Sequence, residues 1–368
     1  MTSELYPAGR LGQVRDAVRS AGLDAVLLTP GPDLRYVTGY DATQLERLTC
    51  LVVPAQGGAA LFVPRLELAA AQASPVSGSG LELIAWQETE DPFGMVARRL
   101  GQVTAVGLSD RMWAMSALRF RDALPGTRLE LAGPVLRPLR ITKTAAEVTA
   151  LREAGAAIDR VHAQVPGWLR PGLSERAVGV RVSEAILAEG HASVDFVIVA
   201  SGPNAASPHH EVSDRVLAAG DVVVVDIGGT MPSGYCSDST RTYAIGEPPA
   251  EFTGYYTVLQ DAQQAACDAV RPGAPAESVD AAARDPITRA GYGDAFFHRT
   301  GHGIGLESHE DPYIVAGNGE PLRPGMAFSV EPGIYPGPHG ARIEDIVVVT
   351  EDGYQRLNQA PRDLVVTG

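Results

Sequence analysis

The chain has 368 residues, 45% of them hydrophobic, and a formal net charge of −14 at pH 7. This length and composition predict a globular protein with room for two domains, and the negative charge argues against nonspecific binding to nucleic acid or anionic membranes. Three cysteines, odd in number and far apart, favour a reducing compartment over a disulfide framework. Because no apolar leader opens the chain and no run of eighteen apolar residues occurs, we expect a cytoplasmic protein.

The first third of the chain alternates helix-like and strand-like segments, which predicts a small α/β domain. Trp86 and Tyr36 are expected in its core. The expected elements are an amphipathic helix at 10–22, strands at 24–29, 48–55 and 59–64, and a loop at 74–80. The chain then becomes rich in proline and glycine, and we place a domain boundary there, giving domains 1–135 and 136–368.

The second domain begins with a long helical pattern. Thr144 is a candidate N-cap for it, and Glu147 lies three residues later, as in a capping box. The elements expected after it are a helix at 174–189, strands at 194–201, 221–229 and 238–246, helices up to about 291, and strands at 326–335 and 341–350.

Residues 298–310, HRTGHGIGLESHE, contain three of the eight histidines. His298 and His302 are four apart, as in a zinc-protease helix, but three glycines would each cost about 1 kcal/mol in a helix interior and no glutamate follows His298. The glycine spacing does not match a dinucleotide-binding loop either. We therefore expect extended or irregular backbone, whose histidines converge only with partners from elsewhere in the chain.

Four acidic residues lie on or at the ends of predicted strands: Asp226, Asp238, Glu331, and Glu344 beside Asp345. A hairpin would bring the two aspartates together, and a carboxylate at the end of a buried strand is costly unless it is paired or bound to a cation. Four acids with one imidazole suit a pair of hard or borderline divalent ions better than a structural zinc. Two ions about 3.5 to 4 Å apart can hold a hydroxide for attack on a carbonyl.

These four acidic residues and His302 together resemble the ligand set of the pita-bread metallopeptidases, peptidase family M24, which include methionine aminopeptidase, prolidase and aminopeptidase P. They are Asp226, Asp238 in GYCSDSTRT, His302 in TGHGIGL, Glu331 in EPGIY and Glu344 in ARIEDIVVVT. The resemblance covers essentially the whole chain. It implies a mixed α/β (α+β) fold, in which a creatinase-like N-terminal α/β domain precedes a pita-bread catalytic domain with a curved, mostly antiparallel sheet and flanking helices.

The resemblance also implies a role for each ligand. Asp226 would be a terminal ligand of one metal, Asp238 and Glu344 would bridge both metals, and His302 with Glu331 would complete the other. The implied cofactors are two divalent metal ions, with Mn²⁺ expected and Co²⁺ or Zn²⁺ as alternatives.

Other residues match substrate-side positions of the family. His209 matches the substrate-facing histidine, while His298 and His309 match those that line the proline side and stabilise the tetrahedral intermediate. Arg342 resembles an arginine that organises the metal ligands, and Tyr335 a phenol behind them. An oxyanion flanked by a metal and an imidazole donor is stabilised by several kcal/mol.

The implied function is that of a metal-dependent exopeptidase that hydrolyses the Xaa-Pro bond through a hydroxide bridging two metals. We expect a homodimeric, prolidase-like Xaa-Pro dipeptidase, with an Xaa-Pro aminopeptidase acting on longer peptides as the alternative. The two differ in whether the pocket closes after proline and leaves a basic group for its carboxylate. Methionine aminopeptidases lack this kind of N-terminal domain, and no nucleic-acid or membrane partner is expected.

Two other classes were weighed. The string DIGGT at 226–230 resembles the phosphate-binding turn of an actin-like sugar kinase, but it lies past mid-chain and no lysine-bearing P-loop occurs. A metal-free relative such as a creatinase is disfavoured because all five ligand positions are filled.

Several residues are more simply interpreted as structural. His162, His191 and His339 are expected at the surface or in loops, and His210 is left open because it neighbours His209. Cys236 is expected to be a small buried thiol and not a ligand.

Overall fold

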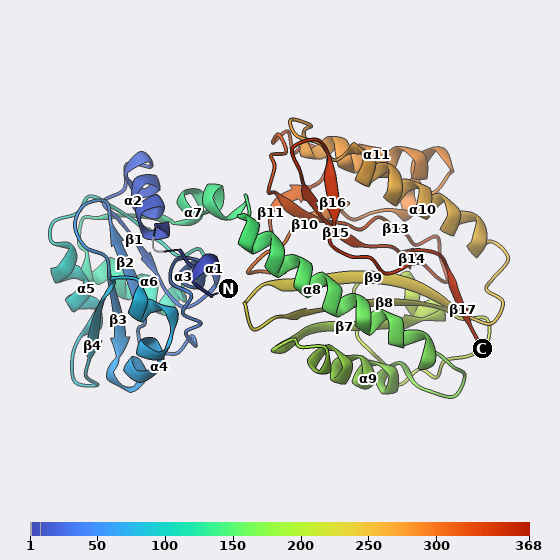
Figure 1. Ribbon diagram of the computed structural model, residues 1–368, viewed down its shortest axis with the longest axis horizontal. Coiled ribbons are helices and arrows are strands. Elements are labelled where there is room, and N and C mark those ends of the chain that lie inside the picture. The colour runs from blue at the N-terminus through green and yellow to red at the C-terminus, as the bar shows by residue number, and fades with distance from the viewer. Residues whose placement is uncertain (1, 8) are drawn as a thin grey trace. The chain divides into compact units, whose positions relative to one another are not determined.

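The computed structural model describes residues 2–7 and 9–368, which divide into two compact units, one ending at Arg140 and the other beginning at Ile141 (Figure 1). Each unit has its own sheets and its own hydrophobic core. No helix within these described residues is both long enough and apolar enough to cross a membrane.

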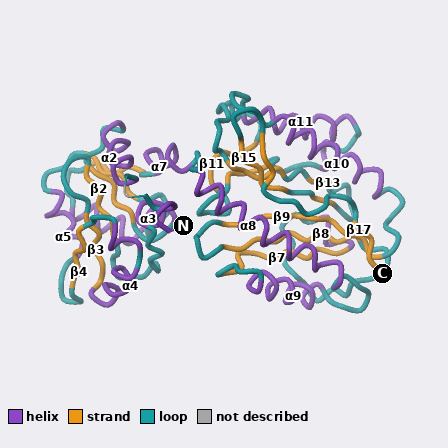
Figure 2. Tube along the Cα trace, in the orientation of Figure 1, coloured by secondary structure: helices purple, strands orange, loops and turns teal. Residues whose placement is uncertain are grey.

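The N-terminal unit is built on a mixed six-stranded sheet with the strand order β4-β3-β2-β1-β5-β6. Helices lie against this sheet (Figure 2). Trp86 and Tyr36 are buried, as predicted. The strands are β1 (Ala25–Leu28), β2 (Cys50–Pro54), β3 (Ala60–Pro64), β4 (Glu82–Trp86), β5 (Ala105–Leu108) and β6 (Arg128–Leu131). The α-helices are α1 (Thr2–Leu5), α2 (Arg10–Ser20), α3 (Pro32–Thr38), α4 (Leu68–Ala73), α5 (Pro92–Leu100), α6 (Ala114–Ala123) and α7 (Gly133–Arg140).

The predicted helix at 10–22 and the three predicted strands of this unit correspond to α2, β1, β2 and β3. The segment 74–80, expected as a loop, contains a short 3₁₀ helix, η2 (Pro75–Gly78), because the Ser74 hydroxyl accepts a hydrogen bond from the Val76 N–H and Pro75 supplies a suitable φ for the first turn. A second 3₁₀ helix, η1 (Arg65–Glu67), precedes α4.

Two larger sheets and a short ribbon form the second unit. One sheet has the order β17-β9-β8-β7, the other the order β11-β10-β12-β15-β16, and β13 pairs with β14. Neighbouring strands are antiparallel except for β17 beside β9. The strands are β7 (Ser193–Ser201), β8 (Val222–Thr230), β9 (Cys236–Ile245), β10 (Gly301–Gly303), β11 (Glu310–Ile314), β12 (Ala327–Val330), β13 (Gly333–Ile334), β14 (Ala341–Arg342), β15 (Asp345–Val349), β16 (Tyr354–Arg356) and β17 (Val365–Thr367).

Four long helices cover these sheets, α8 and α9 on one side and α10 and α11 on the other (Figure 1). α8 begins with the predicted capping box, in which Thr144 and Glu147 exchange hydrogen bonds between side chain and backbone. The helices are α8 (Ala145–Gln164), α9 (Glu175–Ala188), α10 (Phe252–Ala269) and α11 (Ala276–Arg289), with 3₁₀ turns η3 (Val165–Gly167), η4 (Gly202–Ala206) and η5 (Gly293–Ala295).

Alternation along β8 divides the core and sets the direction of Asp226. Val223 and Val225 pack in the cluster beneath α8 and α9, whereas Val222 and Val224 pack with α10 and α11. Because successive side chains of a strand point to opposite faces, Asp226 shares the face of Val222 and Val224. The carboxylate is thereby directed between the two halves of the unit and not beneath α8 and α9.

Two predicted strands are each broken into two pieces. The segment 326–335 forms β12 and β13 with Glu331 between them, and 341–350 forms β14 and β15 with Glu344 between them. At each break the regular pairing of strands is interrupted. The glutamate side chain there need not follow the alternation of faces that a regular strand imposes. The breaks therefore occur at the two glutamates that the sequence singled out.

Three histidines were expected at the surface or in loops. His191 and His339 do lie in loops, whereas His162 lies within α8, and none of the three is at the surface. His162, His191 and His339 are at most 5% exposed, and each satisfies both ring nitrogens inside the protein. Burial lowers the pKa of His162 to about 3. A buried neutral imidazole with two hydrogen-bond partners is a packing element, which helical periodicity alone does not reveal.

Candidate metal centre

The two aspartates are brought together by the hairpin of β8 and β9, as the sequence predicted. Asp226 lies opposite Thr240 and Gly228 opposite Asp238, so that both carboxylates project from the same face two residues apart in register. Gly228 is required there because a Cβ would lie 2.4 Å from the Phe196 ring. The DIGGT string is thus the second half of a buried antiparallel strand, which excludes the phosphate-turn reading of the sequence.

His302 enters from β10, whose flanking glycines allow an unusually close approach of neighbouring strands. A Cβ at position 301 would lie 1.9 Å from the Ser329 carbonyl oxygen, and one at 303 would lie 2.1 Å from that of Asp311. The predicted extended or irregular backbone of HRTGHGIGL is therefore confirmed, and its glycines serve the packing of β10 between β11 and β12.

All five predicted metal ligands converge. One ligand atom from each of Asp226, Asp238 and Glu344 lies within 4.8 Å of the others, and the same holds for His302, Glu331 and Glu344. Glu344 belongs to both groups. The His302 Nε2 atom lies 3.2 Å from Glu331 Oε1 and 3.6 Å from Asp238 Oδ2. These groups form two adjacent candidate cation sites that share Glu344, and a third group, Asp238, His302 and His309, overlaps both.

The clustered carboxylates need a compensating positive charge. Burial, reinforced by the charges of Glu344 and Asp226, raises the pKa of Asp238 well above its usual range, and burial with Glu331 and Asp226 does the same to Glu344. Burial also acts to raise the pKa of Glu331, but the hydrogen bond and charge of His302 outweigh it and lower the pKa to about 2. Like charges held this close cannot all ionise without a compensating positive charge.

Two further observations fit divalent metal ions. Asp226 Oδ1 is buried and receives no hydrogen bond from the described residues, although its Oδ2 accepts one from Arg342. His302 Nδ1–H donates to the Gly303 carbonyl at 3.1 Å, which directs Nε2 at the carboxylates. An imidazole anchored through one nitrogen, with the other aimed at carboxylates, is a common arrangement of a metal ligand.

Polar side chains behind the ligands hold them in place. Thr240 Oγ1 donates to Glu344 Oε2 at 2.8 Å, and Ser329 Oγ donates to Glu331 Oε1 at 3.0 Å. Arg342 donates to Thr240 Oγ1 and to the Tyr335 hydroxyl. Burial raises the pKa of Tyr335 to about 12, so the phenol stays neutral. Sequence reasoning missed Thr240, although its period-two spacing from Asp238 places it on the same face.

The carboxylates open into a cavity of about 680 Å³ that also contains the predicted substrate-side histidines. The His309 ring lies against that of His302, with ring centroids 3.8 Å apart and the planes tilted by 36°. The partial burial of His309, with the charge of His302, lowers its pKa to about 4. His298 bonds the Arg299 carbonyl and the Tyr335 hydroxyl. Besides the five ligands, the polar residues lining the cavity are Ser207, His209, His210, Glu211, His298, Arg299, Ser308, His309 and Arg342.

His209 belongs to a loop that is fixed by a single buried carboxylate. Glu175, at the first turn of α9, accepts hydrogen bonds from Ser201, Asn204, His210 and Ser213. These bonds lower the pKa of Glu175 to about 2, although its burial acts in the opposite direction. His210, which the sequence left open, is thus an anchor of the loop, while its neighbour His209 is exposed to the cavity.

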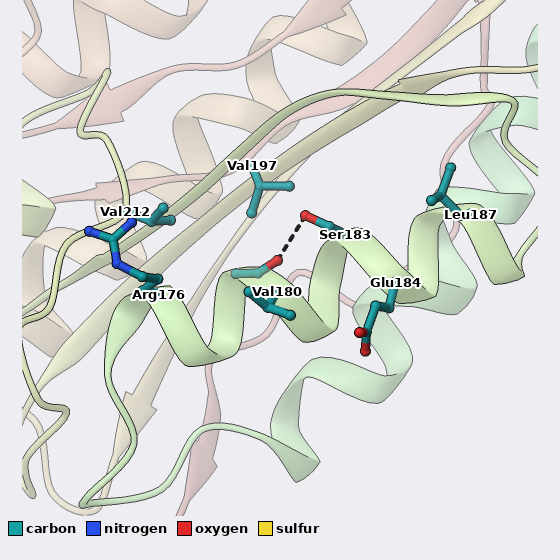
Figure 3. A pocket seen from close by; sticks show the side chains of 8 residues that line it. Arg176, Val180, Ser183, Glu184, Leu187, Val197 and Val212 are labelled. Atoms are coloured by element: carbon teal, nitrogen blue, oxygen red, sulfur yellow. Dashed lines mark hydrogen bonds between the residues drawn. The ribbon is translucent and has the colours of Figure 1, made fainter.

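A second hollow, of about 410 Å³, lies between α9 and β7 (Figure 3). Its walls are mainly aliphatic, and Ser183 in it bonds the Gly179 carbonyl of its own helix. It contains one acidic residue, Glu184, and no histidine. None of the groups of candidate metal ligands in the described residues lies there.

Comparison with known proteins agrees with this geometry. Residues 149–351 match the model of metallopeptidase family M24, and residues 10–142 match the creatinase/prolidase N-terminal domain. A probable dipeptidase PepE of Mycobacterium tuberculosis is 55% identical over 366 residues, covering 99% of this chain and 97% of that protein.

Solved structures show the same likeness. Dipeptidase PepE from Mycobacterium ulcerans has 54% identity and a TM-score of 0.93, covering 100% of this chain and 99% of that one. A prolidase from Thermococcus sibiricus has 36% identity and a TM-score of 0.91, covering 97% and 98%. The resemblance and the fold class inferred from the sequence are therefore confirmed, and the chain belongs to metallopeptidase family M24.

Proposed function

We propose that this protein is a metal-dependent dipeptidase that hydrolyses the peptide bond before proline, with two divalent metal ions supplying the activated water. The observation that carries the proposal is the pair of overlapping ligand groups sharing Glu344 at one end of a cavity of peptide size. Relatives named as a probable dipeptidase, a prolidase and an Xaa-Pro dipeptidase support the substrate class.

Metal binding follows from the donor set. Asp226, Asp238 and Glu344 would hold one ion, and His302, Glu331 and Glu344 the other, with Asp238 close enough to His302 to reach both. When bound, such a pair supplies an activated water and polarises the scissile carbonyl. Oxygen-rich sites with one imidazole suit Mn²⁺, which we propose as the native ion ahead of Co²⁺ and Zn²⁺.

The side chains around the metals would act on the substrate. His309, neutral at pH 7 because of its lowered pKa, can donate an N–H hydrogen bond to the negative charge that develops on the carbonyl oxygen. His298 and His209, which also line the cavity, would contact the bound peptide. Arg342 orients Asp226 through a buried ion pair.

A parallel assay tests this function. The protein reconstituted with Mn²⁺ is incubated with Ala-Pro, Ala-Pro-Gly and Ala-Gly, with a chelator-treated sample as control. Cleavage of Ala-Pro that chelation abolishes is the expected result. Preferential cleavage of the tripeptide would assign an Xaa-Pro aminopeptidase instead, and equal cleavage of Ala-Gly would remove the proline specificity. The cytoplasmic location and the homodimer remain predictions. Sedimentation of the purified protein tests whether it is a dimer.

A further inference from the structure

Lys143 is the only lysine of the chain, in which lysine and arginine together number 30. It is also buried in an ion pair: its Nζ atom lies 2.6 Å from Glu310 Oε1, and the two side chains are 2% and 9% exposed. A buried ion pair often stabilises a fold no more than apolar side chains of similar volume would. The place of this pair in the fold is therefore more informative than its contribution to stability.

The backbone of Lys143 is anchored on both sides. Its N–H donates to the Gly325 carbonyl at 2.8 Å, and the preceding residue, Thr142, forms an isolated bridge with Met326. A Cβ at Gly325 would lie 2.7 Å from the Lys143 carbonyl oxygen, so the two backbones pack directly against each other. The following residue, Thr144, is the N-cap of α8. The base of the lysine side chain is thus fixed between the start of α8 and the residues that lead into β12.

The partner of this lysine closes the turn between β10 and β11. Glu310 is the first residue of β11 and pairs in register with Gly303 of β10. Its carboxylate lies over the turn, since a Cβ at Gly305 would lie 2.7 Å from Glu310 Oε1. The Gly305 carbonyl accepts a hydrogen bond from the Cys236 N–H at 2.9 Å, which ties the beginning of the same turn to β9. The ion pair with Lys143 therefore fixes the end of a turn whose beginning is already held.

His309 is the last residue of this turn and immediately precedes Glu310. Its side chain is exposed to the catalytic cavity, and its ring centroid lies 3.8 Å from that of the candidate ligand His302. Its ring contacts Arg299 Nη2 only at 3.3 Å, which is long for a hydrogen bond. Because the rotamers open to a side chain depend on its backbone angles, a shift of the backbone at 309–310 would displace the imidazole from the candidate metal centre.

We propose that Lys143 is a positioning residue for His309: its ammonium holds the Glu310 carboxylate and thereby sets the imidazole beside the candidate metal centre. This inference rests on the proposed function, in which His309 donates a hydrogen bond to the developing oxyanion. Without the ammonium, the carboxylate would be buried without its ion-pair partner, and its turning toward water would carry the backbone at 309–310 with it. A misplacement of about 1 Å in a catalytic group can cost roughly 100-fold in rate.

The test is a double-mutant cycle in the Mn²⁺-loaded protein with Ala-Pro as substrate. Lys143→Met keeps the aliphatic stem and removes the charge. It should lower kcat about 100-fold, while KM and metal content change by less than about threefold. In the His309→Ala background the same substitution should lower kcat by less than about twofold, because the imidazole through which it acts is gone. Lys143→Arg, which keeps the charge in a bulkier planar group, should fall between wild type and Lys143→Met. An equal loss in both backgrounds would overturn the proposal.

Arg140→Met is the matched control for the loss of an ion pair. Arg140 Nη1 lies 2.7 Å from Asp33 Oδ1, the two side chains are 12% and 16% exposed, and both residues belong to the N-terminal unit. This variant should lower the Tm and leave kcat within about twofold of wild type. A loss of kcat as large as that of Lys143→Met would contradict the proposal, because lost stability would then explain both.

A crystal structure of Lys143→Met beside wild type separates failure of this proposal from failure of the proposed function. The His309 ring is expected to leave His302 by more than about 1 Å, which supports the proposal even if no peptide is cleaved. A ring that keeps its 3.8 Å separation from His302 would overturn the proposal whatever the activity. If Lys143→Met does not fold, Glu310→Gln, which keeps the shape of the side chain and removes its charge, takes its place in the cycle and in the crystal with the same expected displacement.

Discussion

Thr240 donates a 2.8 Å hydrogen bond from its buried hydroxyl to Glu344 Oε2, the carboxylate common to both candidate cation sites. Thr240→Val removes this bond with little change of shape. We expect metal affinity to fall about 10- to 100-fold, the usual effect of deleting a group that orients a metal ligand. Competition with a fluorescent chelator measures the affinity directly.

Ser239→Ala is the matched control for this variant. Ser239 is the residue before Thr240 in β9, is equally buried, and its hydroxyl has no hydrogen-bond partner in the described part of the chain. Since it points to the opposite face of the strand, its removal should leave metal affinity unchanged. Similar losses in both variants would mean that Thr240 acts through strand packing.

Glu344 and Asp345 are adjacent and both buried, yet substitution of each should have opposite consequences in the metal-free protein. The raised pKa of Glu344 reflects repulsion within the cluster, so Glu344→Gln should keep or raise the Tm of chelator-treated protein. With metal added, the same variant should lack turnover and most of the metal-induced rise in Tm. Scanning calorimetry with and without Mn²⁺ distinguishes the two conditions.

Asp345→Asn should instead lower the Tm whether or not metal is present. Asp345 Oδ1 lies 2.7 Å from Arg241 Nη2 and its Oδ2 lies 2.5 Å from Arg362 Nε. Loss of the carboxylate therefore leaves the buried guanidinium of Arg241 and the partly buried one of Arg362 uncompensated. A normal metal-induced rise in Tm for this variant, together with lower stability, is the expected pattern. If Asp345→Asn lost the metal and Glu344→Gln kept it, the ligand assignment would be wrong.

His309→Ala should leave the metal content unchanged and lower kcat. The imidazole lies beside the metal ligands and is suited to donate to the oxyanion, a contact worth about 10²- to 10³-fold in kcat at comparable sites. Metal analysis of the purified variant and steady-state kinetics on Ala-Pro provide the two measurements. Unchanged kinetics would show that the role inferred by resemblance is wrong.

The sequence predicted the structure correctly where the spacing of side chains along the chain and local turn or cap residues indicate the same element. The hairpin of Asp226 and Asp238 followed from an apolar run that ends at Asp226 and a glycine-containing turn before Asp238, and the α8 capping box from Thr144 and Glu147. Glu344 and Asp345 could not be separated by such reasoning, because either can face the cavity depending on where the strand breaks. That break, after Arg342, is decided by tertiary contacts with β8 and β9.

Long-range polar partners were also beyond sequence reasoning. His162 follows a helical pattern like that of a surface residue, and its burial depends on Tyr243 and Ser239, about eighty residues away. Arg299 lies within the histidine-rich stretch, but only the approach of Tyr313 and His309 shows that its guanidinium is directed to the cavity. Spacing along the chain predicts strand faces, whereas such contacts depend on how separate elements pack.

The loop that carries His209 offers a final prediction, because Glu175 accepts six hydrogen bonds from it and from the end of β7. Glu175→Gln replaces half of this acceptor with an NH₂ donor that faces other donors, so the loop should loosen. We expect a higher KM for Ala-Pro, and a loss of stability of roughly 3 kcal/mol at pH 7, the equivalent of the pKa shift. Glu184→Gln, at an exposed position of the same helix, should change stability by less than about 0.5 kcal/mol.

The stability difference between wild type and Glu175→Gln should depend on pH in a direction that the pKa of Glu175 determines. The pKa of Glu175 is about 2 in the folded protein against a usual 4.5, so the carboxylate contributes its full stabilisation above about pH 4.5. That contribution declines as the pH falls toward 2, where the folded state also takes up the proton. The gap in unfolding free energy between wild type and Glu175→Gln, measured by urea titration of chelator-treated protein, should therefore shrink between pH 4.5 and pH 2. A gap that stays constant over this range would mean that Gln destabilises through packing alone and that the Glu175 charge does not hold the loop.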